Sequence, residues 1–570
     1  MLRLFGCRFM KRFYKRKAVN QLWLTACSYA TVLAVMVSLL LSASTAFCQM
    51  MINVNQVGYL PDEAKIAVIA SQEPLDSATF HLLASDGKVD FTGTLSADLG
   101  EYLAFKHHYL ANFHRFKDIG KYRVAVGLLE SQTFEIGNSL YGGIPDSLMR
   151  FFKVQRCGSN DALLHAECHL YDVRKVVSKN GTSDAPLDLT GGWHDAGDYV
   201  KFSVTTAYSS YLLLLTAELF PKSKPQLEAE ARIGLEWLLK MHPTPDRLIT
   251  QVEGVADHKV GWRMPEADPL AKKRTAYEFP SQAQAGIVSA ALAFGARAYR
   301  EGDANELAGR FLRASEELYA FALSGRLSAA ASPPDSHYFD AEARDDLALA
   351  AAELYATTQR VEYLDSAKAI LSVIGAGGWV SWGDVEGFAC YRAGQFWPAS
   401  VEMLQASLQR YEQIADNNPY GYPASSFPWG SLALQTGVAN LAVLYAKMTG
   451  DRQFDTLAIR QRDFLLGTNP YGVSLVSELG SVHVRHFHHQ IAAIKRIPLP
   501  GGVAGGLVSR KTFTTSGIRL EAPDRFASIQ STTTVFHDDR MDFLTNEPTI
   551  SGVAQAILLL AWCENAGMGH

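Results

Sequence analysis

The sequence has little cysteine, little charge and no excess of positive charge, and each deficit excludes a class of protein. Seven cysteines in 570 residues are too few for a disulfide-built scaffold. Charged residues make up 19% of the chain and hydrophobic residues 48%, so the chain can bury a large interior and is not intrinsically disordered. A net charge of −5 at pH 7 argues against a broadly basic surface for nucleic acid.

Several catalytic signatures are also missing. The sequence contains neither a GxSxG nucleophile elbow nor a GxxxxGKS/T phosphate loop, so it gives no support to the chemistry that either motif carries. His483, His486, His488 and His489 stand close together, but no HExxH helix or cysteine pair accompanies them. We therefore predict that this patch hydrogen-bonds a polar ligand, with an exposed basic loop as the alternative, and we assign no metal ligand.

The first 48 residues form a candidate export signal. Seven basic residues and no acidic one lie in 1–21, an uncharged apolar run fills 22–41, and small residues follow. This order is typical of a signal peptide, cleaved after Ala46 or Cys48. An uncleaved anchor stays open, whereas lipidation of Cys48 is disfavoured by the bulky Phe47. Either way we expect a secreted, periplasmic or cell-surface protein, with a net charge of −12 without its basic leader.

Two domains follow the leader. Seven short extended runs broken by turn residues predict an all-β immunoglobulin-like sandwich over 51–138. The runs are Ile52–Val57, Lys65–Ile69, Thr79–Leu83, Val89–Thr92, Tyr102–Phe105, Tyr122–Val126 and Gln132–Ile136. After a linker at 138–145, residues 139–570 take on a helical period. We expect helices near 146–156, 203–219, 227–239, 282–299, 303–321, 341–357, 361–374, 394–415, 430–449, 454–466 and 548–565. Antiparallel pairs curled into a toroid suit these eleven helices, and the lack of a fixed repeat weakens a helical solenoid.

The loops between the helices carry the candidate chemistry. In residues 191–199, Asp195 and Asp198 lie in a glycine-rich stretch, where both acids can face one water. Trp193 and Tyr199 beside them have flat faces of the kind that stack on sugar rings. A calcium loop or a helix cap is the alternative interpretation of this stretch.

A second acidic loop lies just before the last helix. Glu547 precedes Pro548, so the helix dipole would ordinarily keep Glu547 ionised. To act as an acid it needs burial or carboxylate neighbours that raise its pKa, and Asp538, Asp539 and Asp542 are the candidate neighbours.

Taken together, these loops resemble glycoside hydrolase family nine, which includes many cellulases. The resemblance rests on residues 191–202, 427–431 and 466–470, on Phe536, Asp538, Phe543, Glu547 and Thr549, and on residues 55–60, which are similar to the immunoglobulin-like module of many bacterial members. It covers nearly the whole chain after the leader, with the landmarks in the family's order.

The resemblance implies a mainly α protein whose catalytic domain is an (α/α)6 barrel that hydrolyses glycosides with inversion. Glu547 would be the general acid and Asp198 the general base, with Asp195 helping to hold the water and Asp538 carried over as an active-site acid. Inversion needs two carboxyl groups about 6.5–9.5 Å apart on opposite sides of the scissile bond. The expected substrate contacts are Trp193, Tyr199, Trp262, His488 and Gln490.

Some positions depart from the family pattern. Gln490 stands where the family has an arginine, so a charged contact to the sugar is lost. Phe487, Leu432 and Val553 replace a proline and two asparagines, and residues 345–349 depart from the Asp-Glu-Leu-x-Trp pattern. None of these changes removes a catalytic carboxylate, but together they leave the identity of the sugar open.

We therefore expect an exported, inverting endo-β-1,4-glucanase that acts on a β-linked glucan and binds no nucleic acid. An exo-acting β-glucosaminidase or β-glucosidase of the same family is the alternative, and a non-catalytic glycan-binding protein is a weaker one. Trp262, Trp379, Trp382 and Trp429 are either sugar platforms or core residues.

We expect no cofactor for the chemistry, and the resemblance allows a structural calcium ion. A membrane partner is expected only for an uncleaved leader or a lipidated Cys48. Pairing of Cys157 with Cys168 stays undecided, whereas Cys390 and Cys563 are expected to be buried.

Overall fold

The structure is a computed structural model that describes residues 50–184, 186–300, 305–333, 337–375 and 378–567. The predicted export signal lies outside these residues. Within them, no helix is both long enough and apolar enough to cross a membrane.

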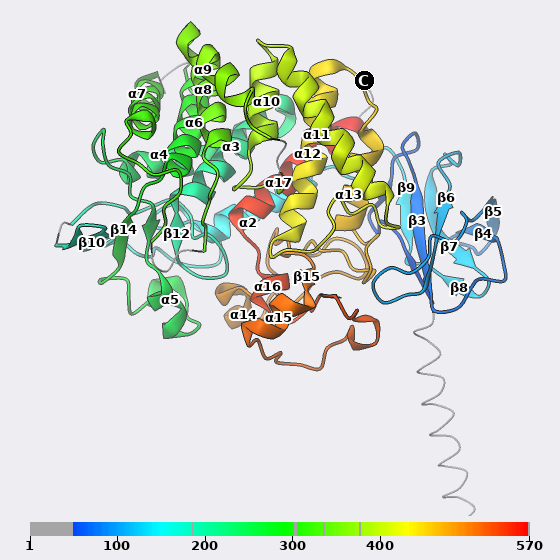
Figure 1. Ribbon diagram of the computed structural model, residues 1–570. Helices are drawn as coiled ribbons and strands as arrows, with labels where there is room; N and C mark the ends of the chain where they lie inside the picture. The colour runs from blue at the N-terminus through cyan, green and yellow to red at the C-terminus, as the bar shows by residue number, and fades with distance from the viewer. Residues whose placement is uncertain (1–49, 185, 301–304, 334–336, 376–377, 568–570) are drawn as a thin grey trace, which may run out of the picture.

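The first domain is a β-sandwich, drawn in blue in Figure 1. One sheet has the order β1-β3-β6 and the other β2-β9-β7-β4-β5, with β8 paired to β7. Their bounds are β1 Met50–Asn53, β2 Gly58–Tyr59, β3 Ile66–Ser71, β4 Thr79–Ala84, β5 Val89–Thr94, β6 His107–Asn112, β7 Gly120–Val126, β8 Leu129–Glu130 and β9 Phe134–Ile136. Phe80, Phe113 and Phe134 are buried between the sheets, and the Phe113 ring contacts the rings of both Phe80 and Phe134.

One predicted strand is wrong. Tyr102 and Phe105 exchange backbone hydrogen bonds of 3.0 and 3.3 Å across a tight turn, and the strand is β6, two residues later. The Tyr102 ring packs against Tyr420 of the second domain, with ring centroids 5.9 Å apart. The apolar residues of this run are therefore used at the domain contact instead of in a sheet.

The second domain is a closed double ring of helices. Among the described residues, twelve helices have nine residues or more: α2 Ile144–Gln155, α3 Ser203–Leu219, α4 Lys224–Met241, α6 Gln282–Ala298, α7 Asn305–Leu323, α8 Arg344–Thr358, α9 Val361–Leu371, α10 Glu386–Gly394, α11 Ala399–Asp416, α12 Ser431–Thr449, α13 Asp455–Leu465 and α17 Ile550–Gly567. The inner helices contact one another in the order α3, α6, α8, α10, α12, α17 and back to α3. The other six alternate with them along the chain and pack outside, which confirms the (α/α)6 barrel (Figure 1).

The sequence predicted eleven of these helices and missed α10. The segment Glu386–Gly394 is buried on nearly every side, so it lacks the apolar and polar faces that mark a surface helix. With α10 included, the helices form six pairs and the ring closes.

The ring order also explains how the two acidic loops meet. Asp198 lies five residues before α3, and Glu547 lies three residues before α17. These helices are neighbours in the inner ring, so the loops at their N-termini converge at one end of the barrel. The short helices α5 Val255–Val260, α14 Gln490–Lys495, α15 Arg510–Ser516 and α16 Phe543–Asn546 lie at the same end (Figure 1).

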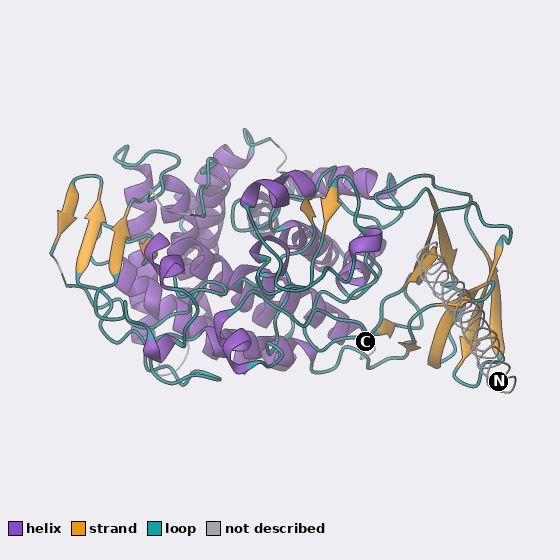
Figure 2. Cartoon of the chain, turned by 90° about the horizontal axis from the view of Figure 1, so that it is seen from below, coloured by secondary structure: helices purple, strands orange, loops and turns teal. Residues whose placement is uncertain are grey.

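A small five-stranded sheet flanks this end of the barrel. Its order is β11-β10-β14-β13-β12, with bounds β10 Lys175–Ser178, β11 Gly181–Ser183, β12 Lys201–Phe202, β13 Gln251–Val252 and β14 Thr275–Glu278. Figure 2 shows this sheet and the β-sandwich on opposite sides of the helical body. Because β12 follows the loop 191–200 directly, the sheet fixes where that loop ends.

Candidate active site

A cavity of about 440 Å³ opens at the loop end of the barrel. Its lining includes four carboxylates, three histidines and four tryptophans: Asp195, Asp198, Asp257, Glu547, His258, His337, His488, Trp262, Trp379, Trp382 and Trp429. Concave sites with aromatic walls and a few convergent polar groups are typical of ligand-binding pockets.

Asp198 is held as an anion by a histidine. His258 Nε2 lies 2.7 Å from one carboxylate oxygen, and the backbone N–H of Val200 donates to the other at 3.0 Å. Burial raises the pKa of Asp198, but the hydrogen bond and charge of His258 outweigh it, so the pKa lies below its ordinary value. In return Asp198 raises the pKa of His258 to about 9. At neutral pH the pair is therefore a carboxylate and an imidazolium.

Glu547, unlike Asp198, favours its protonated form. Burial, reinforced by the nearby charge of Asp198, raises the pKa of Glu547 well above its ordinary value. One of its oxygens accepts a 3.1 Å hydrogen bond from the backbone N–H of Gly197. A Cβ at Gly197 would lie 2.1 Å from the carbonyl oxygen of His488, so only glycine allows the two loops to approach this closely.

Asp195 is buried in the wall of the same cavity. The Thr205 and Tyr338 hydroxyls each donate to one of its carboxylate oxygens. Burial raises the pKa of Asp195 to about 7. The backbone N–H of Asp195 donates to the Val200 carbonyl at 2.9 Å, which closes the loop that carries Asp198.

The expected sugar contacts divide into two groups. Trp262, His488 and Gln490 line the cavity, and the rings of Trp262 and His488 lie 5.5 Å apart, edge to face. The Gln490 side-chain oxygen accepts from the backbone N–H of Arg263 at 3.0 Å, so this oxygen is already committed and the amide is held in place.

Trp193 and Tyr199 do not line the cavity, and their expected stacking on sugar is wrong. The Trp193 ring is fully buried and donates to Glu230 at 2.9 Å, while the Tyr199 hydroxyl donates to the Arg263 carbonyl. In a tightly turning loop successive side chains point to different sides, and here both rings are buried in the protein instead of facing the cavity.

Asp538 also lies outside the cavity lining. Its side chain is buried, pairs with Arg525 at 3.1 Å, and accepts from the backbone N–H groups of Arg485 and His486 at 3.0 and 2.8 Å. Asp538 therefore fixes the loop that leads to His488 instead of facing the cavity.

The sequence-based reasoning missed His258 and Tyr338, which contact Asp198 and Asp195 respectively. Each is a single polar residue 60 or 143 positions from its partner, with no local motif around it. Only the folded ring brings them together, so the sequence held no signal for them.

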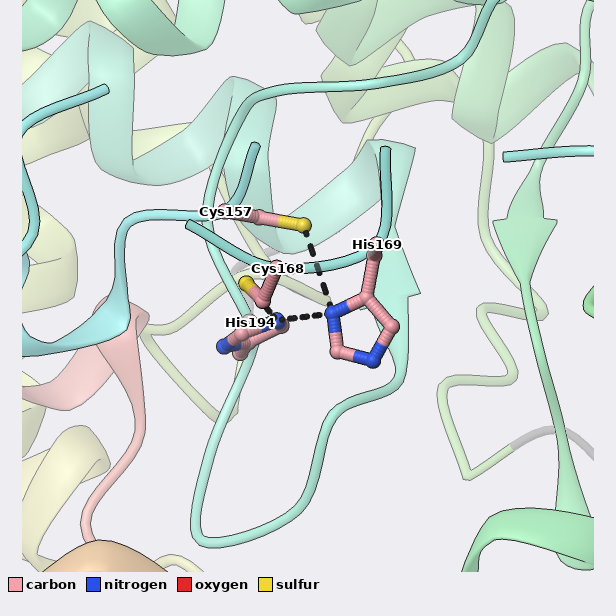
Figure 3. Close-up of side chains that lie close together, drawn as sticks. All are labelled: Cys157, Cys168, His169 and His194. Carbon is pink, nitrogen blue, oxygen red and sulfur yellow. Dashed lines mark hydrogen bonds between the residues drawn. The ribbon is translucent and has the colours of Figure 1, made fainter. Parts of the chain in front are cut away.

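A second cluster includes His194 of the loop 191–200 (Figure 3). Cys157, Cys168, His169 and His194 are all buried, and one ligand atom from each lies within 4.8 Å of the others. His169 Nδ1 lies 3.2 Å from His194 Nε2 and 3.8 Å from the Cys157 sulfur. His194 Nε2 lies 3.9 Å from the Cys168 sulfur. The two thiols are free, so the pairing left undecided by the sequence is not formed.

These four residues fit the ligand set of a tetrahedral zinc site. With zinc bonds of about 2.0–2.3 Å, tetrahedral ligands lie about 3.3–3.8 Å apart, close to the separations seen here. His169 Nε2 is 2.9 Å from an Asp268 carboxylate oxygen, the outer contact that orients a metal-binding histidine. None of these four residues was predicted as a metal ligand, because the cysteines lie in no paired CxxC motif and the histidines lie outside the patch at 483–489.

Comparisons with known proteins agree with this geometry. The family profile described as glycosyl hydrolase family 9 matches residues 141–560, and the cellulase N-terminal ig-like domain matches 49–131. A xyloglucan-specific endo-beta-1,4-glucanase of Bacteroides ovatus is 27% identical, over 80% of this chain and 85% of that protein. A cellodextrinase of Butyrivibrio fibrisolvens is 26% identical, over 80% of this chain and 89% of that protein.

Solved structures give the same picture. A metagenome-derived glycoside hydrolase family 9 endoglucanase has a TM-score of 0.76 and 26% identity, over 90% of this chain and 99% of that one. A thermostable endoglucanase from Alicyclobacillus acidocaldarius has a TM-score of 0.76 and 25% identity, with the same coverage. Since the family profile spans most of the chain and the barrel and its acidic loops agree with it, the chain belongs to glycosyl hydrolase family 9.

Proposed function

We propose that this protein is an exported endo-β-1,4-glucanase that inverts the anomeric configuration, with Glu547 as general acid and Asp198 as general base. The observation that carries the proposal is the opposite ionisation of two carboxyl groups in one cavity. His258 keeps Asp198 charged, whereas burial keeps Glu547 protonated. Two carboxyl groups whose surroundings push their pKa values apart are the acid and the base of a hydrolase.

In this proposal each group moves one proton. Glu547 donates its proton to the glycosidic oxygen as the bond breaks. Asp198 accepts a proton from the water that attacks the opposite face of the anomeric carbon. Asp195, fixed by Thr205 and Tyr338, accepts a hydrogen bond from the same water and orients it.

The aromatic side chains of the cavity favour cleavage within a polymer over cleavage at its end. Trp262, Trp379, Trp382 and Trp429 line it together, and Trp429 keeps 43% of its surface exposed. Several sugar-sized aromatic faces suit several consecutive glucose units. The likeness to a xyloglucan-specific endo-beta-1,4-glucanase supports a β-1,4-glucan as substrate.

The second candidate is hydrolysis of short oligosaccharides, and the likeness to a cellodextrinase supports it. Sizing the products formed from soluble β-glucan and from cello-oligosaccharides separates the two. A fast fall in polymer length indicates endo action, and release of monosaccharide alone would favour the second candidate. Chito-oligosaccharides in the same panel test the β-glucosaminidase alternative.

The remaining expectations stay predictions. Cleavage of the 48-residue leader is checked by sequencing the amino terminus of the exported protein. Structural calcium is checked by the metal content of the purified protein. Among the described residues the two compact sets of metal-ligating atoms are the cysteine–histidine cluster and Asp198, Asp257 and His258, and neither is made of oxygen alone.

Replacing the two carboxyl groups tests the assigned roles. We expect Glu547→Gln and Asp198→Asn each to lower kcat at least about thousandfold on soluble glucan, with unfolding midpoints near that of the parent protein. Glu521→Gln is the matched control, because Glu521 is half-exposed beside Arg540 and does not line the cavity. Near-parental turnover in either variant would contradict the roles, and an initial product with retained configuration by NMR would contradict inversion.

A further inference from the structure

Three charged side chains form a buried cluster beside the loop 191–200. The Asp172 carboxylate pairs with the Lys201 ammonium at 2.8 Å and with the Arg274 guanidinium at 3.3 Å, and all three side chains are fully buried. Asp172 and Arg274 meet because each stands just before one of two strands that pair in parallel, β10 and β14. One carboxylate balances only one of the two cations, so the second cation needs further partners to offset the cost of burial.

Those partners are backbone carbonyls of the loop that carries the catalytic acids. Lys201 Nζ donates to the carbonyls of Leu189 and Gly191 at 2.8 and 3.1 Å. Because Lys201 directly follows the loop, its side chain ties the end of the loop to its start. Arg274 Nη2 donates to the Tyr199 carbonyl at 2.6 Å, next to the proposed base Asp198.

The peptide group that Arg274 holds also holds the base. The Tyr199 carbonyl and the Val200 N–H belong to one planar trans peptide, in which they point in opposite directions. The Val200 N–H donates to one Asp198 oxygen at 3.0 Å, and His258 lies 2.7 Å from the other. A guanidinium that fixes the carbonyl on one side of this peptide therefore aims the N–H at the carboxylate on the other side.

We propose that Arg274 is a positioning residue for the catalytic base, because its guanidinium, aimed by Asp172, fixes the Tyr199–Val200 peptide that holds Asp198. Lys201 supports this arrangement by closing the loop. Arg274 does not line the cavity, so it acts on the reaction only through this peptide. The inference rests on the proposed function, since that function names Asp198 as the base.

The first test removes the guanidinium by Arg274→Met. Asp172 keeps Lys201 as a partner in this variant, so no buried carboxylate is left without a cation. We expect faster hydrogen exchange in the segment 196–202 and a fall in kcat of about tenfold to hundredfold, with KM within about twofold of the parent value. Both are measured on the full-length protein with soluble β-glucan.

The acid limb of the kcat/KM profile gives a second readout. When the Val200 N–H is no longer aimed at Asp198, the carboxylate loses a hydrogen bond that favours its ionised form. We expect the acid limb to move to higher pH by about 0.5–1 unit. The other titratable groups of the cavity are unchanged in the variant, namely Asp195, Asp257, His258, His337, His488 and Glu547.

Arg392→Met is the matched control. Arg392 is also buried and pairs with a buried carboxylate, Glu353, which keeps Arg297 as its second cation at 2.8 Å. Arg392 lies in α10 and does not line the cavity. We expect both variants to lower the unfolding midpoint, but only Arg274→Met to change exchange at 196–202, kcat and the acid limb. A purely structural role for Arg274 would give the pattern of Arg392→Met.

Arg274→Lys keeps a positive charge and a donor on a shorter side chain. We expect it to recover part of the loss in kcat and part of the protection from exchange, and it replaces Arg274→Met in these measurements if the methionine variant does not fold. Parental exchange and parental kcat in the Arg274 variants would overturn the inference. A shifted acid limb with unchanged exchange would also overturn it, because the lost charge alone would then explain the shift.

Neither of these results affects the proposed function. Parental turnover in Asp198→Asn would contradict the proposed function instead, whereas faster exchange at 196–202 in Arg274→Met would still show that Arg274 holds the loop. The two proposals can therefore fail separately.

Discussion

The state of the catalytic base depends on one neighbouring side chain. Replacing His258 by Asn leaves Asp198, which is partly buried in the cavity with Glu547, without its cation, so the pKa of Asp198 must rise. The base works only when ionised, so the acid limb of the kcat/KM profile should move to higher pH. The alkaline limb, where Glu547 loses its proton, should not move to lower pH.

Measuring kcat/KM from pH 4 to 10 checks this prediction. At the acid end we expect the variant to lose about tenfold relative to its plateau. His486→Asn is the control, because His486 is exposed and does not line the cavity. An acid limb at the same pH in both variants would show that His258 does not control the base.

Replacing Trp429 and replacing Trp193 should have different effects. Trp429 is 43% exposed in the cavity, and Trp193 is fully buried with a hydrogen bond to Glu230. Trp429→Ala should raise KM on glucan about fivefold to tenfold with an unchanged unfolding midpoint. Trp193→Ala should lower the free energy of unfolding by about 3–5 kcal/mol. Steady-state kinetics and denaturant unfolding of both variants check this, and a stable Trp193→Ala with raised KM would restore the sugar-stacking hypothesis.

These residues mark what the sequence can reveal about a site. Asp195, Asp198 and Glu547 stand in local motifs, so the sequence predicted all three as members of one cavity. Trp193 lies in the same motif, yet the side to which a loop residue points depends on packing that the motif does not encode. The cysteine–histidine cluster combines three segments of residues 157–194, and of its members only Cys157 and Cys168 were considered together from the sequence.

The inner helices depend on glycines for their close approach. A Cβ at Gly286 of α6 would lie 2.8 Å from the Asp346 side chain and 2.9 Å from its backbone carbonyl carbon in α8. Gly309 of the outer helix α7 has no neighbouring atom within 4 Å of the same position. Both glycines are helical, so an alanine brings the same intrinsic helix preference at each site.

We therefore expect opposite effects on stability. Gly286→Ala should destabilise the protein by about 1–3 kcal/mol through overpacking, and Gly309→Ala should stabilise it by about 0.5–1 kcal/mol. Urea unfolding followed by far-UV circular dichroism measures both. Equal shifts in the two variants would mean that α6 and α8 can move apart without cost.

The helices that were predicted from the sequence have either an apolar face opposite a polar one or clear capping and proline signals at their ends. For example, α7 has a buried row including Leu307, Phe311 and Leu318, and its opposite side is polar. α10 lacks such a contrast because α8, α11 and α12 surround it. Closure of the ring also lies beyond periodicity, because the period of each helix says nothing about which helix is its neighbour.

The two domains are joined by a buried polar contact. Arg462 of α13 is fully buried and pairs with Glu63 of the β-sandwich through two 2.7 Å hydrogen bonds. The same guanidinium donates to Asp463, which also accepts from Asn55 at 2.8 Å. These partners are about 400 residues apart in sequence, so the two domains were predictable but their contact was not.

This contact should make the two domains unfold as one unit. Arg462→Met keeps the length of the side chain but leaves Glu63 and Asp463 buried without a cation. Removing one partner of a buried ion pair costs about 3–5 kcal/mol, because the remaining charge is neither solvated nor paired. We expect calorimetry to show one transition for the parent protein and two separate, lower transitions for the variant. Lys117→Met, which breaks a solvent-exposed pair with Asp62 in the β-sandwich, should leave the single transition in place. A single unshifted transition for Arg462→Met would show that the domains stay coupled without this ion pair, through the other contacts between them.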